Sequence, residues 1–183
     1  VKGAAFVAMF KFFVTLSSTE NFYDVMIWLS ALSLIIANTV ALWQSDVKRL
    51  LAYSSISHAG FMLGAILFAT YSSPQALLFY VVTYSVASLA AFGVLQYVSN
   101  FTNNTVTFDS FKGLVRRNPI LAGTMTLALL SMAGIPPLSG FMAKYLVITG
   151  VMKGGALWLA VIMILTSVVS VFYYLRLMVC MFT

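Results

Sequence analysis

The chain has 183 residues, of which 62% are hydrophobic and only 8% are charged, with a mean hydropathy of +1.01. Soluble domains carry about 25% charged residues, so the 10 basic and 4 acidic side chains are too few to cover a water-soluble fold of this size. The composition excludes a soluble domain and predicts a membrane protein whose apolar runs cross the bilayer as helices of about 20 residues.

Polar clusters divide the chain into about six expected transmembrane helices, which we assign to one all-α domain over residues 1–183. The expected helices cover residues 1–17, 22–44, 50–71, 75–98, 120–150 and 156–183. The polar stretch over residues 99–118, with FTNNT and DSFKGLVRR, predicts a loop with a short interfacial helix.

The first expected helix contains two lysines, Lys2 and Lys11, which fall on opposite faces at 100° per residue. Lys11 is close enough to the helix end to extend its side chain to the interface. From the residues alone, Lys2 is either a terminal charge or a functional lysine.

The third expected helix has a polar stripe, in which Ser54, Ser57 and His58 follow one another at i, i+3 and i+4. The stripe also passes near Lys48. Such a stripe can hold water and relay protons, because an imidazole donates and accepts in turn. The alternative is hydrogen bonding between helices by small polar residues, which is common in membranes.

The fifth expected helix contains SMAGIPPLSGFMAKYLV, which is interrupted at Gly134, Pro136, Pro137 and Gly140. Two prolines remove backbone donors and clash with the preceding turn, so the helix must break there. A break at membrane depth is tolerated only where it is buried in protein or lines a wet cavity. Broken helices of this kind form ion sites in transporters.

Lys144 lies four residues after Gly140, among apolar neighbours. A charged lysine at this depth costs several kcal/mol, so it must be partnered, hydrated or neutral part of the time. Burial disfavours the ammonium and a nearby carboxylate favours it. A lysine between these influences can take up and release a proton. The alternative is that Lys144 extends to the interface, as we expect of Arg176 in the last helix.

The basic residues of the connecting loops predict the orientation in the membrane. The loops after the second and fourth helices contain Lys48, Arg49, Lys112, Arg116 and Arg117, whereas those after the first, third and fifth contain only Lys153. The basic loops should face the cytoplasm or the mitochondrial matrix. The net charge of +6 is thus a topology signal and gives no reason to expect nucleic-acid binding. The lone Cys180 excludes an internal disulfide and a cysteine-built metal or iron–sulfur site.

Two long segments resemble the antiporter-like membrane subunits of respiratory complex I, NADH:ubiquinone oxidoreductase, and most closely its chain 2 family. They are VKRLLAYSSISHAGFML, residues 47–63, and RRNPILAGTMTLALLSMAGIPPLSGFMAKYLV, residues 116–147. VFYYLRLM, residues 171–178, fits the helix that follows, and VKGAAFVAMFKFF aligns Lys2 with a buried lysine of that family. The resemblance covers essentially the whole chain.

The resemblance implies the C-terminal half of an antiporter-like fold of inverted repeats, without the N-terminal repeat. It implies that Lys2 and Lys144 carry protons in redox-driven proton translocation, with His58, Lys48, Ser54 and Ser57 as a hydrated relay. The chain would be a non-redox subunit, because FMN, iron–sulfur clusters and ubiquinone would be bound by other subunits of the complex.

The expected partners are other membrane-arm subunits, lipids and a separate chain that carries the N-terminal half, because residues 2–17 are too short to span roughly 30 Å. The expected location is the mitochondrial inner membrane or, alternatively, a bacterial plasma membrane. Two other functions stay open. The chain could belong to a multi-chain cation/proton antiporter or a membrane-bound hydrogenase, or it could be a purely structural subunit.

Overall fold

The computed structural model describes residues 20–69, 74–101 and 106–183, in which all the regular elements are helices. Within these described ranges, four helices are long and apolar enough to cross a membrane: α2 (Glu20–Leu42), α3 (Val47–Leu67), α4 (Pro74–Phe101) and α9 (Leu157–Phe182). Between α4 and α9 lie the short helices α5 (Phe108–Phe111) and α6 (Leu114–Arg117), then α7 (Pro119–Ala133) and α8 (Ser139–Lys153). The expected first helix, with Lys2 and Lys11, lies outside the described residues.

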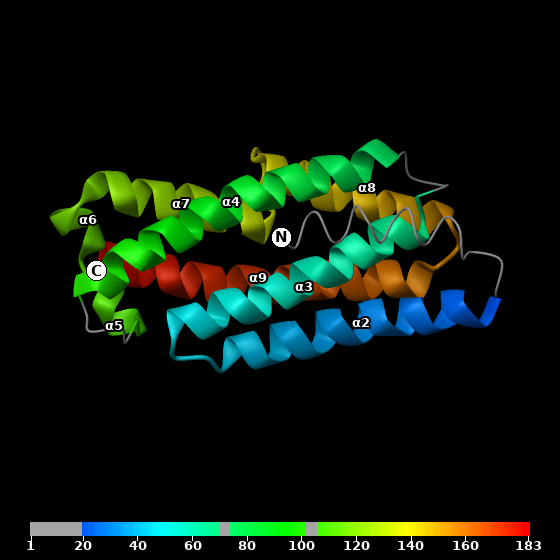
Figure 1. The fold of residues 1–183 in the computed structure, drawn as a ribbon, viewed down its shortest axis with the longest axis horizontal. Helices are drawn as coiled ribbons and strands as arrows, with labels where there is room; N and C mark the ends of the chain where they lie inside the picture. The colour runs from blue at the N-terminus through cyan, green and yellow to red at the C-terminus, as the bar shows by residue number, and fades with distance from the viewer. Residues whose placement is uncertain (1–19, 70–73, 102–105) are drawn as a thin grey trace.

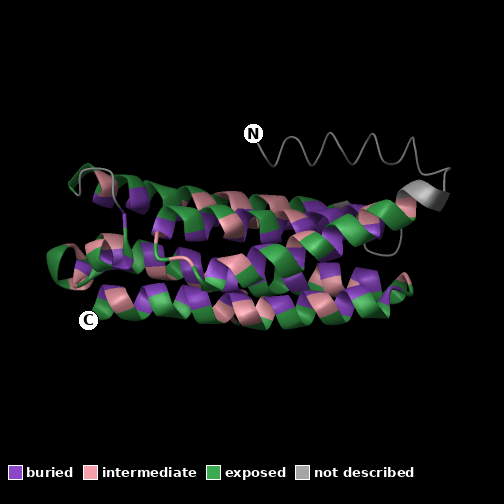
Figure 2. Ribbon diagram, turned by 90° about the horizontal axis from the view of Figure 1, so that it is seen from below, coloured by how far each residue is buried: buried purple, intermediate pink, exposed green. Residues whose placement is uncertain are grey.

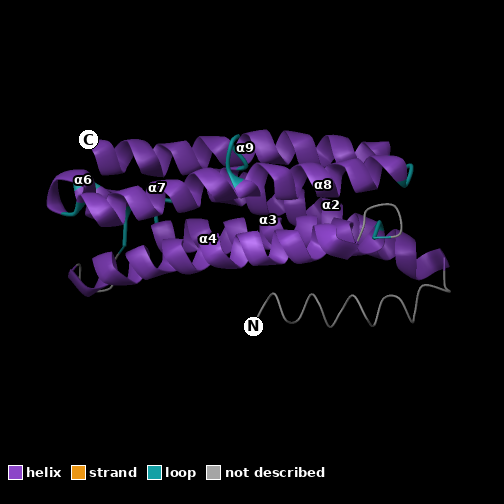
Figure 3. Cartoon of the chain, turned by 90° about the horizontal axis from the view of Figure 1, so that it is seen from above, coloured by secondary structure: helices purple, strands orange, loops and turns teal. Residues whose placement is uncertain are grey.

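The predicted all-α bundle is confirmed, and its helices begin and end within a few residues of the expected positions. The third helix begins early, at Val47, because the Asp46 carboxylate caps it and accepts hydrogen bonds from the backbone nitrogens of Lys48 and Arg49 at 2.7 and 3.2 Å. The polar stretch before Pro119 forms two short helices where one was expected. The predicted break is present between α7 and α8, which Figure 3 shows roughly in line with an interruption between them.

The long helices run side by side along the length of the molecule (Figure 1). Helix α3 occupies the centre and packs against α2, α4, α8 and α9, so that 78% of its membrane-length segment is buried, compared with 28–39% for the other three long helices. Figure 2 shows the exposed positions along the outer faces of the bundle. The polar side chains of α3 are therefore the ones that the fold encloses.

The basic loops gather at one end of the bundle, together with the C-terminus (Figure 1). There the backbone nitrogen of Val47 donates to the carbonyl of Val106 at 2.9 Å, which ties the turn before α3 to the segment before α5. The guanidinium group of Arg176 lies 4.6 Å from the centroid of the Phe108 ring, a cation–π contact that attaches α9 to α5. Lys153 ends α8 at the opposite end.

The apolar core is divided into two clusters with polar side chains between them. One cluster lies toward the end with α5 and α6, and its largest fully buried members include Leu50, Phe111, Met125, Leu129 and Leu177. The other lies toward the opposite end and includes Leu34, Phe61, Met62, Leu159 and Met163. The buried polar layer between them includes Asn38, Ser54, Ser57, His58, Lys144 and Ser170.

Close packing of α2 on α3 depends on a glycine. A Cβ atom at Gly60 would lie 2.9 Å from Cγ of Leu34, so only glycine allows this approach without a shift. The hydroxyl of Ser30 donates to the Gly60 carbonyl at 2.8 Å. In lipid, where no hydrophobic force drives helices together, small residues and such hydrogen bonds hold the helices to one another.

Candidate functional site

The break between α7 and α8 leaves carbonyl groups without backbone donors. Gly134 ends α7 in the left-handed conformation, with φ of 81°, and its nitrogen donates to the carbonyls of Leu130 and Ser131, both at 3.1 Å. In a continuous helix the nitrogens of Pro136 and Pro137 would bond to the carbonyls of residues 132 and 133, but proline has no N–H. Two carbonyls at the end of α7 are therefore free to bind another group.

The side chain of Lys144 binds one of these two carbonyls, that of Ala133. Its ammonium nitrogen donates to the carbonyl oxygen of Ala133 at 2.9 Å and to the hydroxyl of Ser167 on α9 at 3.1 Å. The ring of Phe61 lies 5.4 Å from the same nitrogen. The carbonyl end of a helix carries a partial negative charge, which favours a cation there. Lys144 is only 6% exposed, so the alternative that it extends to the interface is wrong.

The two glycines of the break make room for this arrangement. At Gly134 a Cβ atom would lie 2.9 Å from Cδ of Lys144, so the lysine side chain packs directly over the glycine. At Gly140 a Cβ atom would collide with the carbonyl oxygen of Ser131, because the start of α8 crosses close to the end of α7. All four residues expected to form the break therefore have a defined structural part in it.

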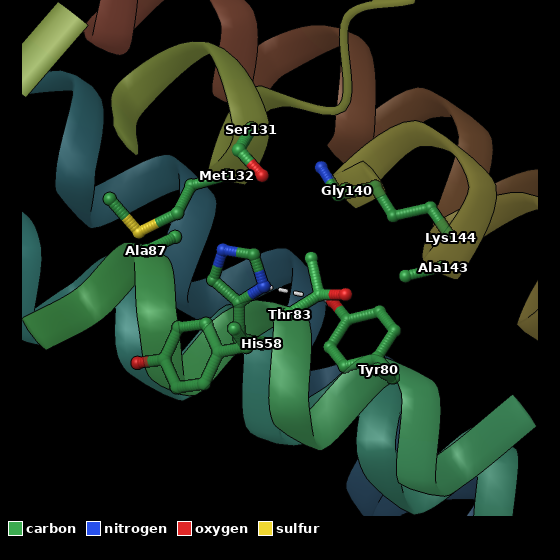
Figure 4. Close-up of a pocket in the computed structure, with 10 residues that line it drawn as sticks. His58, Tyr80, Thr83, Ala87, Ser131, Met132, Gly140, Ala143 and Lys144 are labelled. Atoms are coloured by element: carbon green, nitrogen blue, oxygen red, sulfur yellow. Dashed lines mark hydrogen bonds between the residues drawn. The ribbon is translucent and has the colours of Figure 1, made fainter. Parts of the chain in front are cut away.

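His58 is held between two tyrosines. Its Nδ1 lies 2.8 Å from the hydroxyl of Tyr80 on α4, which Figure 4 marks, and its Nε2 lies 3.4 Å from the hydroxyl of Tyr174 on α9. The ring of Tyr84 packs against the imidazole with 4.5 Å between centroids. The Tyr174 hydroxyl also bonds to that of Ser54. Because an imidazole has one donor and one acceptor nitrogen when neutral, it can pass a proton between these hydroxyls.

A small cavity separates His58 from Lys144. It is lined by His58, Tyr80, Thr83, Tyr84, Ala87, Ser131, Met132, Gly140, Ala143 and Lys144, most of which Figure 4 shows around it. Its volume is about 10 Å³, about the room that the centre of one water molecule needs. The histidine and the lysine thus line the same small cavity from different helices.

The predicted relay residues lie in three different places in the structure. Ser54 and His58 lie in the polar layer, on the side of α3 that faces α9 and α4. Ser57 faces α2, where its hydroxyl accepts a hydrogen bond from Nδ2 of Asn38 at 2.7 Å. Lys48 lies exposed in the first turn of α3 and makes none of these contacts. The polar stripe of α3 therefore contributes side chains to the polar layer and also holds α3 to α2 by a hydrogen bond.

Sequence reasoning missed several buried residues with polar groups in or beside this layer: Asn38, Tyr80, Ser170, Tyr173 and Tyr174. They lie in mainly apolar helices, and we assigned no polar stripe to α2, α4 or α9 from the sequence. The sequence offers only a general indication of such residues: polar groups at membrane depth usually face the protein interior.

A buried lysine at a broken transmembrane helix, beside a buried histidine, is the kind of arrangement that ion sites of membrane transporters have. The chain belongs to the family described as NADH:quinone oxidoreductase/Mrp antiporter, TM, whose model matches residues 1–170.

Within that family the chain is similar to subunits of one enzyme. It is 40% identical to NADH-quinone oxidoreductase subunit N of Chloroflexus aggregans over 99% of its length, and 42% identical to the same subunit of Laribacter hongkongensis over 96%. The chain spans 38% and 36% of the lengths of these relatives.

Solved structures share the fold. A chain of respiratory complex I from Thermus thermophilus with bound aureothin matches with a TM-score of 0.78 at 39% identity, over 87% of this chain and 36% of that one. A chain of the membrane-bound sulfane sulfur reductase, an archaeal respiratory membrane complex, matches with 0.83 at 28% identity, over 88% and 33%. A chain of the Mrp complex from Dietzia sp. matches with 0.89 over 98% and 34%, and at 20% identity this likeness concerns the fold alone.

Proposed function

We propose that this chain is part of the subunit N, or chain 2, component of complex I and contributes to redox-driven proton translocation. Lys144 is the proton-carrying group in the described part, and His58 with Ser54 forms a relay beside it. Lys2, which the resemblance aligns with a second buried lysine, is proposed as its counterpart, and Lys48 and Ser57 as outer members of the relay.

One observation carries this proposal: the amine of Lys144 is buried at a helix break without a carboxylate among its described contacts. Its partners are a carbonyl, a hydroxyl and an aromatic ring, which bind both an ammonium and, less strongly, a neutral amine. A full ion pair would favour the charged form much more strongly. This environment supports a lysine whose proton can leave when its surroundings change.

The energy required is within the range of local electrostatics. Moving one charge through 100 mV costs about 2.3 kcal/mol. A charge that approaches to about 4 Å at an effective dielectric constant near 20 changes the energy of an ammonium by about 4 kcal/mol. A charge shift that starts at quinone reduction elsewhere and reaches the region of Lys144 would therefore change the energy of its ammonium by more than the cost of moving one charge through 100 mV.

In this proposal the chain functions within a larger assembly. FMN, iron–sulfur clusters and ubiquinone would be bound by other subunits, so that this chain is a non-redox part of the enzyme. In this proposal the remaining length of the relatives, beyond the part that this chain matches, belongs to the complete translocation unit. The location is the mitochondrial inner membrane or a bacterial plasma membrane, and the bacterial relatives favour the second.

A second candidate follows from the likeness to the sulfane sulfur reductase and from the inclusion of Mrp antiporters in the family. In this alternative the same lysine site works in a multi-chain cation/proton antiporter or a hydrogenase-like complex. The subunits that copurify with the chain distinguish the two, because only complex I brings NADH-oxidising subunits. A purely structural subunit is the remaining alternative, and it predicts that Lys144 can be replaced without loss.

The experiment that tests the proposal replaces Lys144 in the assembled complex. Membrane vesicles that contain Lys144→Ala should pump fewer protons per NADH oxidised, while electron transfer from NADH to an artificial acceptor stays close to normal. Lys153→Ala, at the exposed end of the same helix, is the matched control. Unchanged pumping in Lys144→Ala would remove this lysine from the pathway.

A further inference from the structure

We infer that Tyr174 is a proton relay of this subunit and links His58 to hydroxyl groups nearer the basic end of the bundle. Tyr174 is fully buried, yet its phenol group lies in the polar layer and not among apolar side chains only. Its hydroxyl is placed between Nε2 of His58 and the hydroxyl of Ser54. It is the point where groups from α3 and α9 meet.

The hydrogen bonds form a continuous series across three helices, α4, α3 and α9. Tyr80 on α4 bonds to one nitrogen of His58, and Tyr174 on α9 lies at the other. From Tyr174 the series continues to Ser54 on α3, and the ring of Tyr173 packs beside that of Tyr174 with 4.6 Å between centroids. Each member except the imidazole is a hydroxyl, which can donate one hydrogen bond and accept another.

Asn38 on α2 fixes the hydroxyl of Tyr173, the residue next to Tyr174. Its Oδ1 accepts from the hydroxyl of Tyr173 at 3.1 Å, while its Nδ2 donates to the Leu34 carbonyl and to Ser57, both at 2.7 Å. With these three bonds made, the amide is held firmly and directs the Tyr173 hydroxyl. We assign Asn38 as a positioning residue, since an amide does not pass protons as a hydroxyl does.

The series has a direction in the bundle. Going from Lys144 and Ser167 to Tyr174 moves two helical turns along α9 toward its C-terminus, which lies at the end with the basic loops. Asn38 lies near the end of α2 on that same side. The relay therefore extends from the cavity at the helix break toward the basic end.

Proton transfer along this series leaves each residue with the number of protons that it had before, but it turns the hydroxyls and moves the proton of His58 from Nδ1 to Nε2. A proton that arrives at Ser54 displaces the Ser54 hydroxyl proton onto Tyr174, which passes its own proton to Nε2 of His58. The imidazolium then releases the proton on Nδ1 toward Tyr80 and the cavity shared with Lys144. The reverse order carries a proton away from the lysine. The series is reset when the hydroxyls rotate and the imidazole returns to its first tautomer by a flip of its ring.

This inference rests on the proposed function, and its test separates the two. In the intact complex, Tyr174→Phe retains the ring and removes only the hydroxyl, so it should lower proton translocation per NADH by an amount comparable with Lys144→Ala. Tyr53→Phe makes the same chemical change one residue from Ser54, on a half-buried tyrosine that takes no part in the series, and should pump normally.

A second pair of variants distinguishes loss of the relay from loss of assembly. Ser54→Ala removes the partner hydroxyl of Tyr174 and should impair pumping, whereas Ser54→Thr keeps a hydroxyl and should restore it. A role in packing alone predicts no difference between alanine and threonine in complexes that have assembled equally. Normal pumping in Tyr174→Phe, together with a loss in Lys144→Ala, would overturn the relay and leave the proposed function intact. Normal pumping in both would overturn both.

Discussion

Gly134 and Lys144 pack directly against each other: the Cβ position of residue 134 falls 2.9 Å from Cδ of the lysine and 3.4 Å from its ammonium nitrogen. The same glycine has a φ of 81°, which L side chains rarely adopt. One residue therefore ends α7 and leaves space for the buried amine.

Gly134→Ala should impair both stability and pumping. The left-handed backbone alone costs about 1–2 kcal/mol for a residue with a Cβ, and the added methyl displaces Lys144 from the Ala133 carbonyl. Gly155→Ala is the matched control, because Gly155 has a similar φ of 85° but open space around its Cβ position. Thermal stability should fall in both variants, and proton translocation by assembled complexes only in the first. Equal pumping by the two would show that the lysine tolerates displacement.

Lys144→Arg should also lower proton translocation, although it keeps the positive charge. A guanidinium group remains protonated at any physiological pH, so it cannot release the proton that the mechanism requires. The measurement is proton uptake or release per NADH oxidised, in vesicles with equal amounts of assembled complex. Full pumping with arginine would show that the position needs only a fixed charge.

Gly140→Ala should prevent normal packing of the broken helix. The new methyl collides with a backbone carbonyl of α7 and not with a flexible side chain, so the two helix halves must separate. Such overpacking costs about 1–3 kcal/mol, occasionally more. Gly123→Ala, in the middle of α7 with no atom near its Cβ position, should leave the amount of assembled complex unchanged. If the two variants assemble alike on a native gel, the close crossing of α7 and α8 is incorrect.

Positions 112 and 153 should be labelled from opposite sides of the membrane. The loop after α5 and the end of α8 lie at opposite ends of the bundle (Figure 1). A hydrogen bond to Asp109 raises the pKa of Lys112, which slows amine reagents. Lys112→Cys and Lys153→Cys, each in a Cys180→Ser background, avoid this difference. A membrane-impermeant thiol reagent on the cytoplasmic or matrix side should reach only position 112. Reaction of both positions from that side would contradict the topology.

The sequence was sufficient to predict the fold and the break, because both depend on local chemistry. Long apolar runs separated by polar clusters define membrane helices almost independently of their neighbours. The break follows from Pro136 and Pro137 alone, since no packing can supply the missing N–H groups. The burial of Lys144 was also foreseeable, because it lies one turn after that break.

The partners of these residues could not be predicted from the sequence. Ser54 and Ser57 fall only 60° apart on an ideal helix. Their spacing does not indicate that Ser54 bonds to Tyr174 whereas Ser57 bonds to Asn38. That division arises because α3 is surrounded by four helices, each of which presents its own polar groups. The contact between Lys144 and Ser167 likewise depends on how α9 lies beside α8.

The two apolar clusters on either side of the polar layer have a consequence for energy conservation. A continuous file of water and hydroxyls from one end of the bundle to the other would conduct protons down the membrane potential and short-circuit it. In the described part of the chain, the side chains around Leu50 and Phe111 at one end and Leu159 and Met163 at the other provide electrical insulation. If the chain translocates protons as we propose, a proton held at the layer is separated from both ends by apolar side chains, and turnover must open the two apolar clusters one at a time.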